Sequence, residues 1–440
     1  MQLKFYLGLD FGTSGARACV VDVGQNIAWE HCVTYPDAAT QTHLDWRNAL
    51  HTLLSAMPKT IASELHGLAI DATSATVLLC DAQLDAVSPA LLYHDDRAQQ
   101  QAEQIKSIAP PHHVVCTATS GLAKFLWFTQ QNYCEHAAYF MHQADYLSAL
   151  LSGKPGISDY HNALKTGYDV EHLCWPDWVM ALPSAHLLPR VLAPGAIIGP
   201  IQPGIAAHFG INPHCVVHVG STDSNAAFIA AGAGVVGVGV VGVGVGVTTL
   251  GTTLVVKQLS AQRIEAPEYG VYSHRFGDLW LVGGASNAGG GVLRNYFDDA
   301  QLAALSAQID PLQDSPLDYY PLPRRGERFP VNDAQLAPRL TPRPASDVEF
   351  LHGLLQGLAR IEAAAYTRLA ELGAPPLERV VTCGGGANNV VWRQMRERLL
   401  GVPVAAAVHT DAAYGSALLA VGCNSIAPYS PRSSRSRHSR

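Results

Sequence analysis

The chain has 440 residues, which exceeds the roughly 250–300 at which a single hydrophobic core stops growing, so we expect two domains. Its hydrophobic content of 48% excludes a disordered or fibrous chain. A formal net charge of −7 argues against nucleic acid as a partner, because most of the surface would repel a polyanion.

The first predicted elements are a strand, a tight turn and a second strand. Residues 5–10 are apolar up to Asp10, residues 11–15 form a small-residue turn, and residues 16–23 are apolar again. A turn of Gly and hydroxyl side chains lets a phosphate approach the backbone. Asp10 is placed to hold Mg²⁺ beside this turn, directly or through water. The alternative for Asp10 is an Asx turn that only stabilises the hairpin.

A later strand over 215–220 runs into Ser221-Thr222-Asp223 and a helix over 225–231. Asp223 fits two roles, the N-cap of that helix or the general base for a substrate hydroxyl. The two roles are compatible, because helix N–H groups would keep the carboxylate ionised. We expect the first domain to end after this helix, near residues 232–234.

The apolar segment 226–247 is long enough to cross a bilayer. Its glycines and its Val/Gly alternation favour a strand or loop instead, so no membrane span is predicted. The G-x-G-x-x-G pattern at Gly237, Gly239 and Gly242 is interpreted as a chance match, because no helix opens at its last glycine. The nine cysteines include no C-x-x-C pair, and Asp10 interrupts the apolar N-terminal stretch. Both features predict a cytoplasmic protein with reduced thiols.

The second half repeats the design of the first. A hairpin is expected around the loop 248–253, and a strand over 379–383 ends in Gly384-Gly385-Gly386 before a helix over 388–400. Three glycines allow close approach by a flat or phosphate-bearing ligand, whereas tight strand–helix packing would usually need only one. Two homologous α/β domains facing a cleft would bring these loops around one ligand. Residues 310–343 read as an irregular surface excursion, and the tail from Pro428 reads as disordered.

These segments, in their order, resemble the motifs of the FGGY carbohydrate kinases. The likeness runs from about Leu7 to Leu419. Its motifs are a first phosphate motif (7–17), a catalytic-base motif around Asp223, a second phosphate motif (249–253), an adenosine motif (383–389), and two further matches at 122–127 and 326–330. The resemblance implies an α/β fold of two ribonuclease-H/actin-like domains facing a central cleft. Residues 1–232 would bind the sugar and hold the base, residues 233–424 would bind nucleotide, and residues 425–440 would form a disordered tail.

The resemblance also implies the chemistry. Segments 68–79 and 158–165 look most like those of the compact ketopentose kinases of the family, so we expect ATP-dependent phosphorylation of the terminal hydroxyl of D-ribulose, with Mg²⁺ as cofactor and Asp223 as base. The residues expected at the sugar are Asp10, Ser14, Gly15, Arg17, Ser74 and Asp223. Those expected at phosphate and nucleotide are Gly12, Thr13, Gly251, Thr252, Gly385, Gly386 and Asn389, with Asp10 at the metal.

Three alternatives remain open at this point. They are a kinase for D-xylulose or another polyol, an actin- or chaperone-like ATPase, and a degenerate kinase without catalysis. A homodimer is one expected assembly. Two departures from the family pattern bear on activity: the Val/Gly run 235–247 is longer than the usual link, and the chain after Leu419 passes into Gly422 and a Ser/Arg tail where the family continues in a helix.

Overall fold

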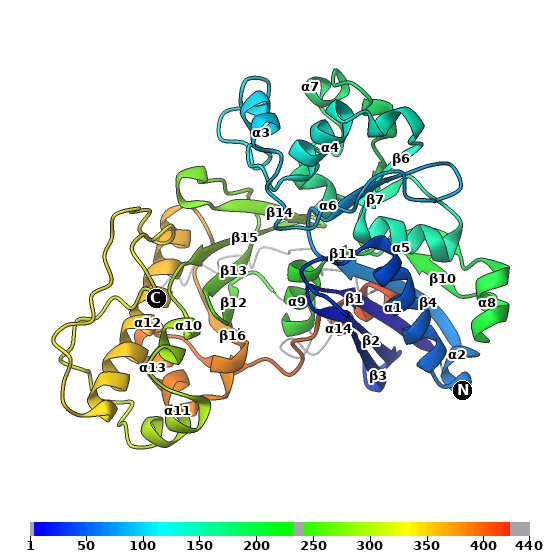
Figure 1. Cartoon of the computed structure of the whole chain (residues 1–440). Helices are drawn as coiled ribbons and strands as arrows, with labels where there is room; N and C mark the ends of the chain where they lie inside the picture. Colours follow the sequence, from blue (N-terminus) through cyan, green and yellow to red (C-terminus); the bar gives the residue numbers. More distant parts are fainter. Residues whose placement is uncertain (1–3, 233–241, 423–440) are drawn as a thin grey trace, which may run out of the picture.

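The computed structural model describes residues 4–232 and 242–422, which form a mixed α/β fold with two large sheets (Figure 1). The predicted α/β class is confirmed. Within the described ranges no helix is long and apolar enough to cross a membrane. Residues 233–241, which include Gly237 and Gly239, and residues 423–440, which include the tail 425–440, lie outside the described residues, so the predictions made for them stay predictions.

The N-terminal sheet has seven strands in the order β3-β2-β1-β4-β10-β9, with β11 paired to β4. Its strands are β1 (Phe5–Phe11), β2 (Gly15–Asp22), β3 (Ile27–Thr34), β4 (Leu65–Ala72), β9 (Ile197–Pro200), β10 (Val216–His218) and β11 (Ser221–Thr222). β1 is antiparallel to β2 and parallel to β4, so Asp10 lies opposite Arg17 on one side and Asp71 on the other. The same half of the molecule contains the helices α1 (His43–Ala56), α2 (Lys59–Ala62), α5 (Gln143–Ser152) and α8 (Pro203–Phe209).

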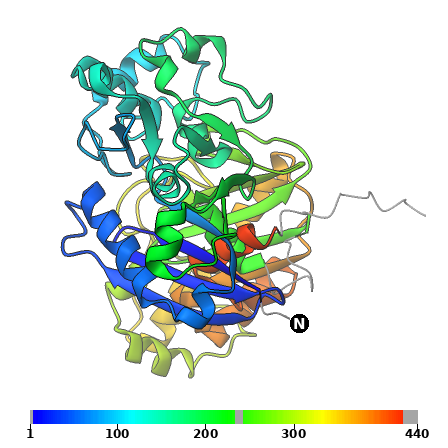
Figure 2. The ribbon, with the colours of Figure 1, turned by 90° about the vertical axis from the view of Figure 1, so that its right-hand side faces the viewer.

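A separate lobe is inserted after β4 and lies above the N-terminal sheet in both ribbon views (Figures 1 and 2). It has its own apolar core, which includes Phe125, Phe128 and Phe140. Its strand pairs are β5 (Val77–Cys80) with β6 (Tyr139–His142) and β7 (Ile157–Asp159) with β8 (Arg190–Leu192). Its helices are α3 (Gln99–Lys106), α4 (Gly121–Gln130), α6 (Tyr160–Ala163) and α7 (Asp177–Met180), with 3-10 turns η1 (Tyr133–His136), η2 (Leu164–Thr166) and η3 (Ala185–Leu187).

The C-terminal sheet has six strands in the order β14-β15-β13-β12-β16-β17. They are β12 (Val245–Leu250), β13 (Leu254–Ser260), β14 (Tyr272–Phe276), β15 (Leu279–Ser286), β16 (Arg379–Cys383) and β17 (Val404–Ala406). The helices and 3-10 turns of this half are η4 (Pro267–Tyr269), α10 (Gly290–Arg294), α11 (Asp299–Ser306), α12 (Asp347–Glu371), η5 (Gly385–Asn388) and α13 (Val390–Leu400). The segment 310–343 contains no helix or strand, as predicted, and α12 begins after it with Ser346 accepting from the Glu349 N–H as N-cap.

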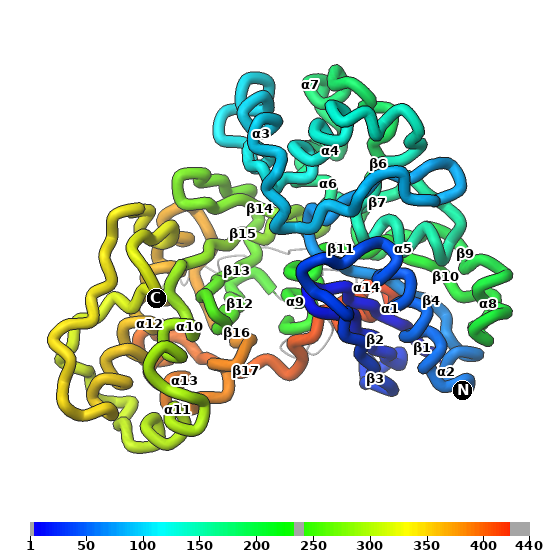
Figure 3. The backbone as a smooth tube through the Cα atoms, viewed as in Figure 1, coloured from blue at the N-terminus to red at the C-terminus, as the bar shows by residue number. Residues whose placement is uncertain are grey.

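Two helices are exchanged between the halves. α9 (Asp223–Gly232) follows the N-terminal sheet, yet its Phe228 packs with Val245 and Val247 of the C-terminal sheet. α14 (Ala412–Val421) follows the C-terminal sheet, and Figure 3 shows the chain running from β17 across to it beside β1. A Cβ atom at Gly8 of β1 would lie 1.8 Å from the Ala413 carbonyl oxygen, so this packing requires glycine. The sequence interpretation missed this exchange.

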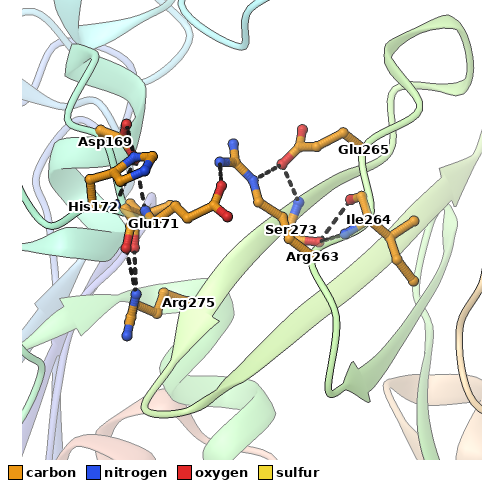
Figure 4. A network of polar contacts seen from close by, with 9 residues as sticks. Asp169, Glu171, His172, Arg263, Ile264, Glu265, Ser273 and Arg275 are labelled. Carbon is orange, nitrogen blue, oxygen red and sulfur yellow. Dashed lines mark hydrogen bonds and ion pairs between the residues drawn. The ribbon is translucent and has the colours of Figure 1, made fainter. Parts of the chain in front are cut away.

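The lobe also contacts the C-terminal half directly, through the polar network drawn in Figure 4. Arg275 of β14 donates from Nη1 to the backbone oxygens of Val170 at 3.1 Å and Glu171 at 3.0 Å. Arg263 pairs with the Glu171 carboxylate at 2.9 Å and with Glu265 at 2.8 Å. These contacts join β14 and the chain segment before it to the lobe.

Candidate active site

The turn between β1 and β2 forms the hairpin predicted to bind phosphate. The Gly12 N–H donates to the Gly15 oxygen at 3.0 Å, which closes the turn, and Gln41 donates from Nε2 to the Thr13 oxygen at 2.9 Å. A Cβ atom at Gly15 would lie 2.2 Å from the Val33 oxygen, so the turn packs on β3 only with glycine there. Thr13 and Ser14 remain exposed at its tip.

The predicted residues of the first half come together around one cavity of about 430 Å³. Seven of them line it: Asp10, Gly12, Thr13, Ser14, Gly15, Arg17 and Asp223. Thr410 and Ala412, just before and at the start of α14, line it as well. The exchanged helices α9 and α14 therefore both contribute to a cavity whose floor is the N-terminal sheet.

Ser74 is the one predicted sugar residue that does not line this cavity. It follows β4 in a turn where Ala75 has the left-handed φ of 61°, an unfavourable conformation for alanine. Lys124 of α4, fully buried, supports the turn by donating from Nζ to the oxygens of Ala75 at 2.8 Å and Leu92 at 2.6 Å. This contact gives the 122–127 motif a structural role. The Ser74 hydroxyl is buried and has no hydrogen-bond partner among the described residues.

Asp10 and Asp71 form a pair of buried carboxyl groups at the carboxyl ends of neighbouring parallel strands. Burial raises the pKa of Asp10 to about 7, and the negative charges of Asp223 and Asp411 act in the same direction. Burial and the charge of Asp10 raise the pKa of Asp71 well above its ordinary value. Arg17 opposes the rise at Asp10, with its Nη1 lying 3.8 Å from Asp10 and 3.5 Å from Asp411.

Asp223 is the first residue of α9, and its Oδ1 accepts the Ser224 N–H at 2.6 Å. Burial raises the pKa of Asp223, while the Ser224 bond and the positive charges of Lys257 and Lys165 lower it. The net direction is upward. Burial therefore outweighs the Ser224 bond and the two cations together, and the expectation that helix N–H groups keep this carboxylate ionised stays a prediction. Sequence cannot show the burial of one carboxylate.

A second cavity of about 770 Å³ lies in the C-terminal half, between the β12–β13 hairpin, α11 and η5. All five residues predicted there line it: Gly251, Thr252, Gly385, Gly386 and Asn389. Gly290 and Gly291 line it too and were not predicted. The Gly290 N–H donates to the Gly251 oxygen at 2.8 Å, so this glycine run packs directly on the second hairpin. The run of three glycines at 289–291 was the available sequence signal.

The Gly384–Gly386 turn serves both packing and access. A Cβ atom would lie 2.5 Å from the Leu250 oxygen at Gly384 and 2.6 Å from Trp392 at Gly386. At Gly385 no atom lies within 4 Å of such a Cβ, so this position faces open space. Asn389 follows the turn, caps α13 by accepting the Trp392 N–H at 2.9 Å, and donates to Ser306 Oγ at 2.8 Å. The helix predicted from residue 388 thus begins at Val390.

Three buried charged side chains, Glu327, Glu362 and Arg396, support the loops of this second cavity. Glu327 accepts from Ser286 Oγ at 2.5 Å and from the Asn287 N–H at 2.8 Å, which holds the chain just before the 289–291 glycines. The ion pair of Glu362 and Arg396 is fully buried beneath the strands that lead into the second hairpin and the Gly384 turn. The 326–330 motif therefore positions a loop rather than contacting the cavity itself.

The residues at Asp10 fit a magnesium ion. Asp10 Oδ1 has no hydrogen-bond partner among the described residues, and Asp10 lines the first cavity beside Thr13 and Ser14. Mg²⁺ is commonly held by one or two carboxylates together with water and substrate phosphates. The described residues contain no cluster of three or more His, Cys, Asp or Glu side chains that could hold a metal by themselves. Asp10 would thus share such an ion with a phosphate-bearing ligand.

Comparison with known proteins bears on the family and the fold of the chain. Sequence profiles for the N-terminal and C-terminal domains of the FGGY family of carbohydrate kinases match residues 5–230 and 246–422. A ribulokinase of Shouchella clausii is 26% identical over 284 residues, spanning 52% of this chain and 50% of that protein. A xylulose kinase of Streptomyces coelicolor is 26% identical over 440 residues, spanning 90% of this chain and 83% of that protein. The crystal structure of a xylulose kinase from Bifidobacterium adolescentis matches the fold with a TM-score of 0.77 at 20% identity, over 97% of this chain and 94% of that chain.

Proposed function

Because the chain belongs to the FGGY family of carbohydrate kinases, we propose that it transfers the γ-phosphoryl group of ATP to the terminal hydroxyl of D-ribulose. The observation that supports this proposal most is the shared cavity of about 430 Å³. Two acids, Asp223 and Asp10, line it together with the Gly and hydroxyl turn 12–15. Such a set can hold a hydroxyl acceptor and a phosphoryl donor at once.

In this reaction Asp223 accepts the proton of the sugar hydroxyl as that hydroxyl attacks the γ-phosphorus in line. The exposed hydroxyl groups of Thr13 and Ser14, together with Gly251 and Thr252, stabilise the charge on the transferred group. Mg²⁺, when bound, neutralises charge on the phosphates, and Asp10 is the residue proposed to hold it. Arg17 contributes positive charge to the same cavity.

The nucleotide occupies the cavity of about 770 Å³ in this proposal. Gly385 leaves its side-chain space open for the adenosine, and Gly386 and Asn389 complete the wall. The phosphates then point toward Gly251 and Thr252 and from there to the first cavity. Closure of the two halves around both ligands would exclude water, which competes with the sugar as acceptor.

The choice of D-ribulose rests on the sequence segments 68–79 and 158–165. Ser74 lies in the first of these, and its buried hydroxyl has no hydrogen-bond partner among the described residues. D-Xylulose is the second candidate, because a xylulose kinase aligns with most of the chain. A cytoplasmic location, with sugar and ATP as partners, belongs to the same proposal, and the cysteines that the structure describes are unpaired.

The test is a panel of pentuloses and polyols assayed for ADP release with MgATP. We expect D-ribulose to give the highest kcat/KM and D-xylulose a lower value. A higher value for D-xylulose would make D-xylulose the acceptor and leave the proposal of a sugar kinase unchanged. ADP release that no sugar stimulates would favour a nucleotide-dependent switch protein. The expected homodimer is tested separately, by size-exclusion chromatography of the same sample.

A further inference from the structure

Lys257 lies in the middle of β13, with β12 on one side and β15 on the other. It pairs with Val247 across one strand boundary and with Gly283 across the other. A Cβ atom at Gly283 would lie 3.0 Å from Lys257 Cγ and 2.5 Å from the Val256 oxygen. The glycine thus leaves room for the lysine stem, and the sheet fixes where that stem begins.

The ammonium group of Lys257 crosses from the C-terminal sheet to the first turn of α9. Its Nζ donates to the Ser224 backbone oxygen at 2.8 Å and to Ser224 Oγ at 2.5 Å. The Ser224 N–H in turn donates to Asp223 Oδ1 at 2.6 Å. Asp223 and Ser224 both line the first cavity. A residue of the second hairpin is therefore bonded to the residue that holds the proposed base.

The charges of Lys257 and Asp223 act on each other. Burial lowers the pKa of Lys257 to about 8, and the charge of Asp223 opposes that lowering. Lys257 in turn lowers the pKa of Asp223, against the effect of burial. The other titratable groups that face Lys257 are Lys165, His161, His274 and Cys383, and burial keeps both histidines neutral near pH 7 by lowering their pKa values. Lys257 and Lys165 are thus the cations that act on Asp223.

We propose that Lys257 is a positioning residue for phosphoryl transfer, which holds Asp223 in place and ionised from the opposite half of the molecule. The inference rests on the proposed function, because it assigns Lys257 the role of supporting the base in that reaction. β13 follows directly from the loop that contains Gly251 and Thr252. The β12–β13 hairpin therefore carries, in its loop, a wall of the nucleotide cavity and, in its second strand, the cation that acts on the base, so the base is supported only when that hairpin is in place.

The first test compares Lys257→Met, which keeps the stem length and removes the charge, with Lys257→Arg, which keeps the charge. We expect kcat of Lys257→Met at pH 7 to fall roughly tenfold, and the acidic limb of its pH–kcat profile to move upward by about one pH unit, because an adjacent opposite charge shifts a carboxyl pKa by that order. KM for ATP should change little, and Lys257→Arg should restore most of kcat. The matched control is Lys154→Met, since the Lys154 ammonium also donates to a backbone oxygen, that of Ile198 at 3.0 Å.

A purely structural tether would lower kcat equally at every pH and leave the acidic limb unmoved, and that result would overturn the inference. A second measurement needs no turnover: thermal midpoints of the parent, Lys257→Met, Asp223→Asn and the double variant. We expect the loss caused by Lys257→Met to be smaller in the Asp223→Asn background, because no carboxylate is then left without its cation. If the midpoint losses of Lys257→Met and Asp223→Asn simply add up in the double variant, the inference is overturned, even if no sugar is phosphorylated. If the midpoint changes are coupled but no sugar activates the parent, the proposed function is overturned and the electrostatic coupling of Lys257 with Asp223 still stands.

Discussion

Ser416 of α14 donates a hydrogen bond of 2.6 Å to Asp71 Oδ2 at the end of β4, although 345 residues separate the two along the chain. Asp71 is fully buried and lies opposite Asp10 in the sheet register. The exchanged helix α14 thus reaches the carboxyl pair beneath the first cavity. The N-cap of α14, Asp411, lies 3.5 Å from Arg17 Nη1, and the same nitrogen lies 3.8 Å from Asp10.

Replacing Ser416 with Ala should therefore weaken the packing of α14 on the N-terminal sheet. Asp71 Oδ2 would lose its donor in a buried place, which costs about 1–3 kcal/mol. Urea denaturation compared with the parent measures this loss. Ser63→Ala, at an exposed site with a long 3.5 Å contact to the Thr60 oxygen, is the control and should change nothing measurable. An equal midpoint for both variants would show that the Ser416 bond does not stabilise the fold.

Asp223→Asn keeps the size of the side chain and an oxygen that can accept the Ser224 N–H, but it removes the base. We expect kcat for sugar phosphorylation to fall by roughly 10²–10⁴, the usual contribution of a general base. ATP affinity, measured by calorimetry, should stay near that of the parent. Near-normal turnover would remove Asp223 from the mechanism.

Gly385→Val tests the adenosine position. No atom lies within 4 Å of a Cβ atom there and the backbone is not left-handed, so the variant should fold normally and project its side chain into the nucleotide cavity. ATP affinity should drop at least ~10-fold, about 1.4 kcal/mol, while sugar binding without nucleotide persists. Gly204→Val, at another open glycine outside both cavities, is the matched control. Unchanged ATP binding by the folded Gly385→Val protein would place the adenosine elsewhere.

Arg396→Met should be the most destabilising of these changes. It leaves Glu362 charged and fully buried without its cation, which typically costs about 3–5 kcal/mol. Arg368→Met removes a surface pair with Glu371 and should cost no more than about 1 kcal/mol. Denaturation midpoints of the two variants, measured side by side, compare the two losses of stability, and we expect the larger loss for Arg396→Met. Similar midpoints would mean that the buried pair contributes little.

Asp10 predicts how the stability of the ligand-free protein depends on pH. Its folded pKa of about 7 lies above the ordinary value of 3.8, so the native state binds the proton more tightly than the unfolded chain. Stability should therefore fall as pH rises from about 4 to about 7 and lose nothing more from this group above that range. Asp10→Asn should flatten this slope and raise the thermal midpoint at pH 8. A parent whose midpoint rises across this window, and an Asp10→Asn variant with the same slope, would contradict the assignment.

The local motifs of both cavities were predictable because a few adjacent residues define each of them. The Gly12–Gly15 turn, Gly251 with Thr252, and the glycines at 384–386 carry their chemistry in consecutive positions. Asp71, Ser416 and Lys257 could not be assigned in this way, because each acts through a contact with a distant part of the chain. The rise of the Asp223 pKa could not be predicted for the same reason: burial depends on every segment packed around the carboxylate.

The exchange of α9 and α14 means that neither half is a self-sufficient folding unit. A chain divided between α9 and β12 would yield one piece whose α9 lacks the apolar partners Val245 and Val247, and another whose α14 lacks β1. We expect each piece alone to aggregate, because its orphaned helix leaves apolar surface in water. Co-expression should let the two pieces assemble into an active heterodimer, since each then supplies the helix that covers the other's sheet.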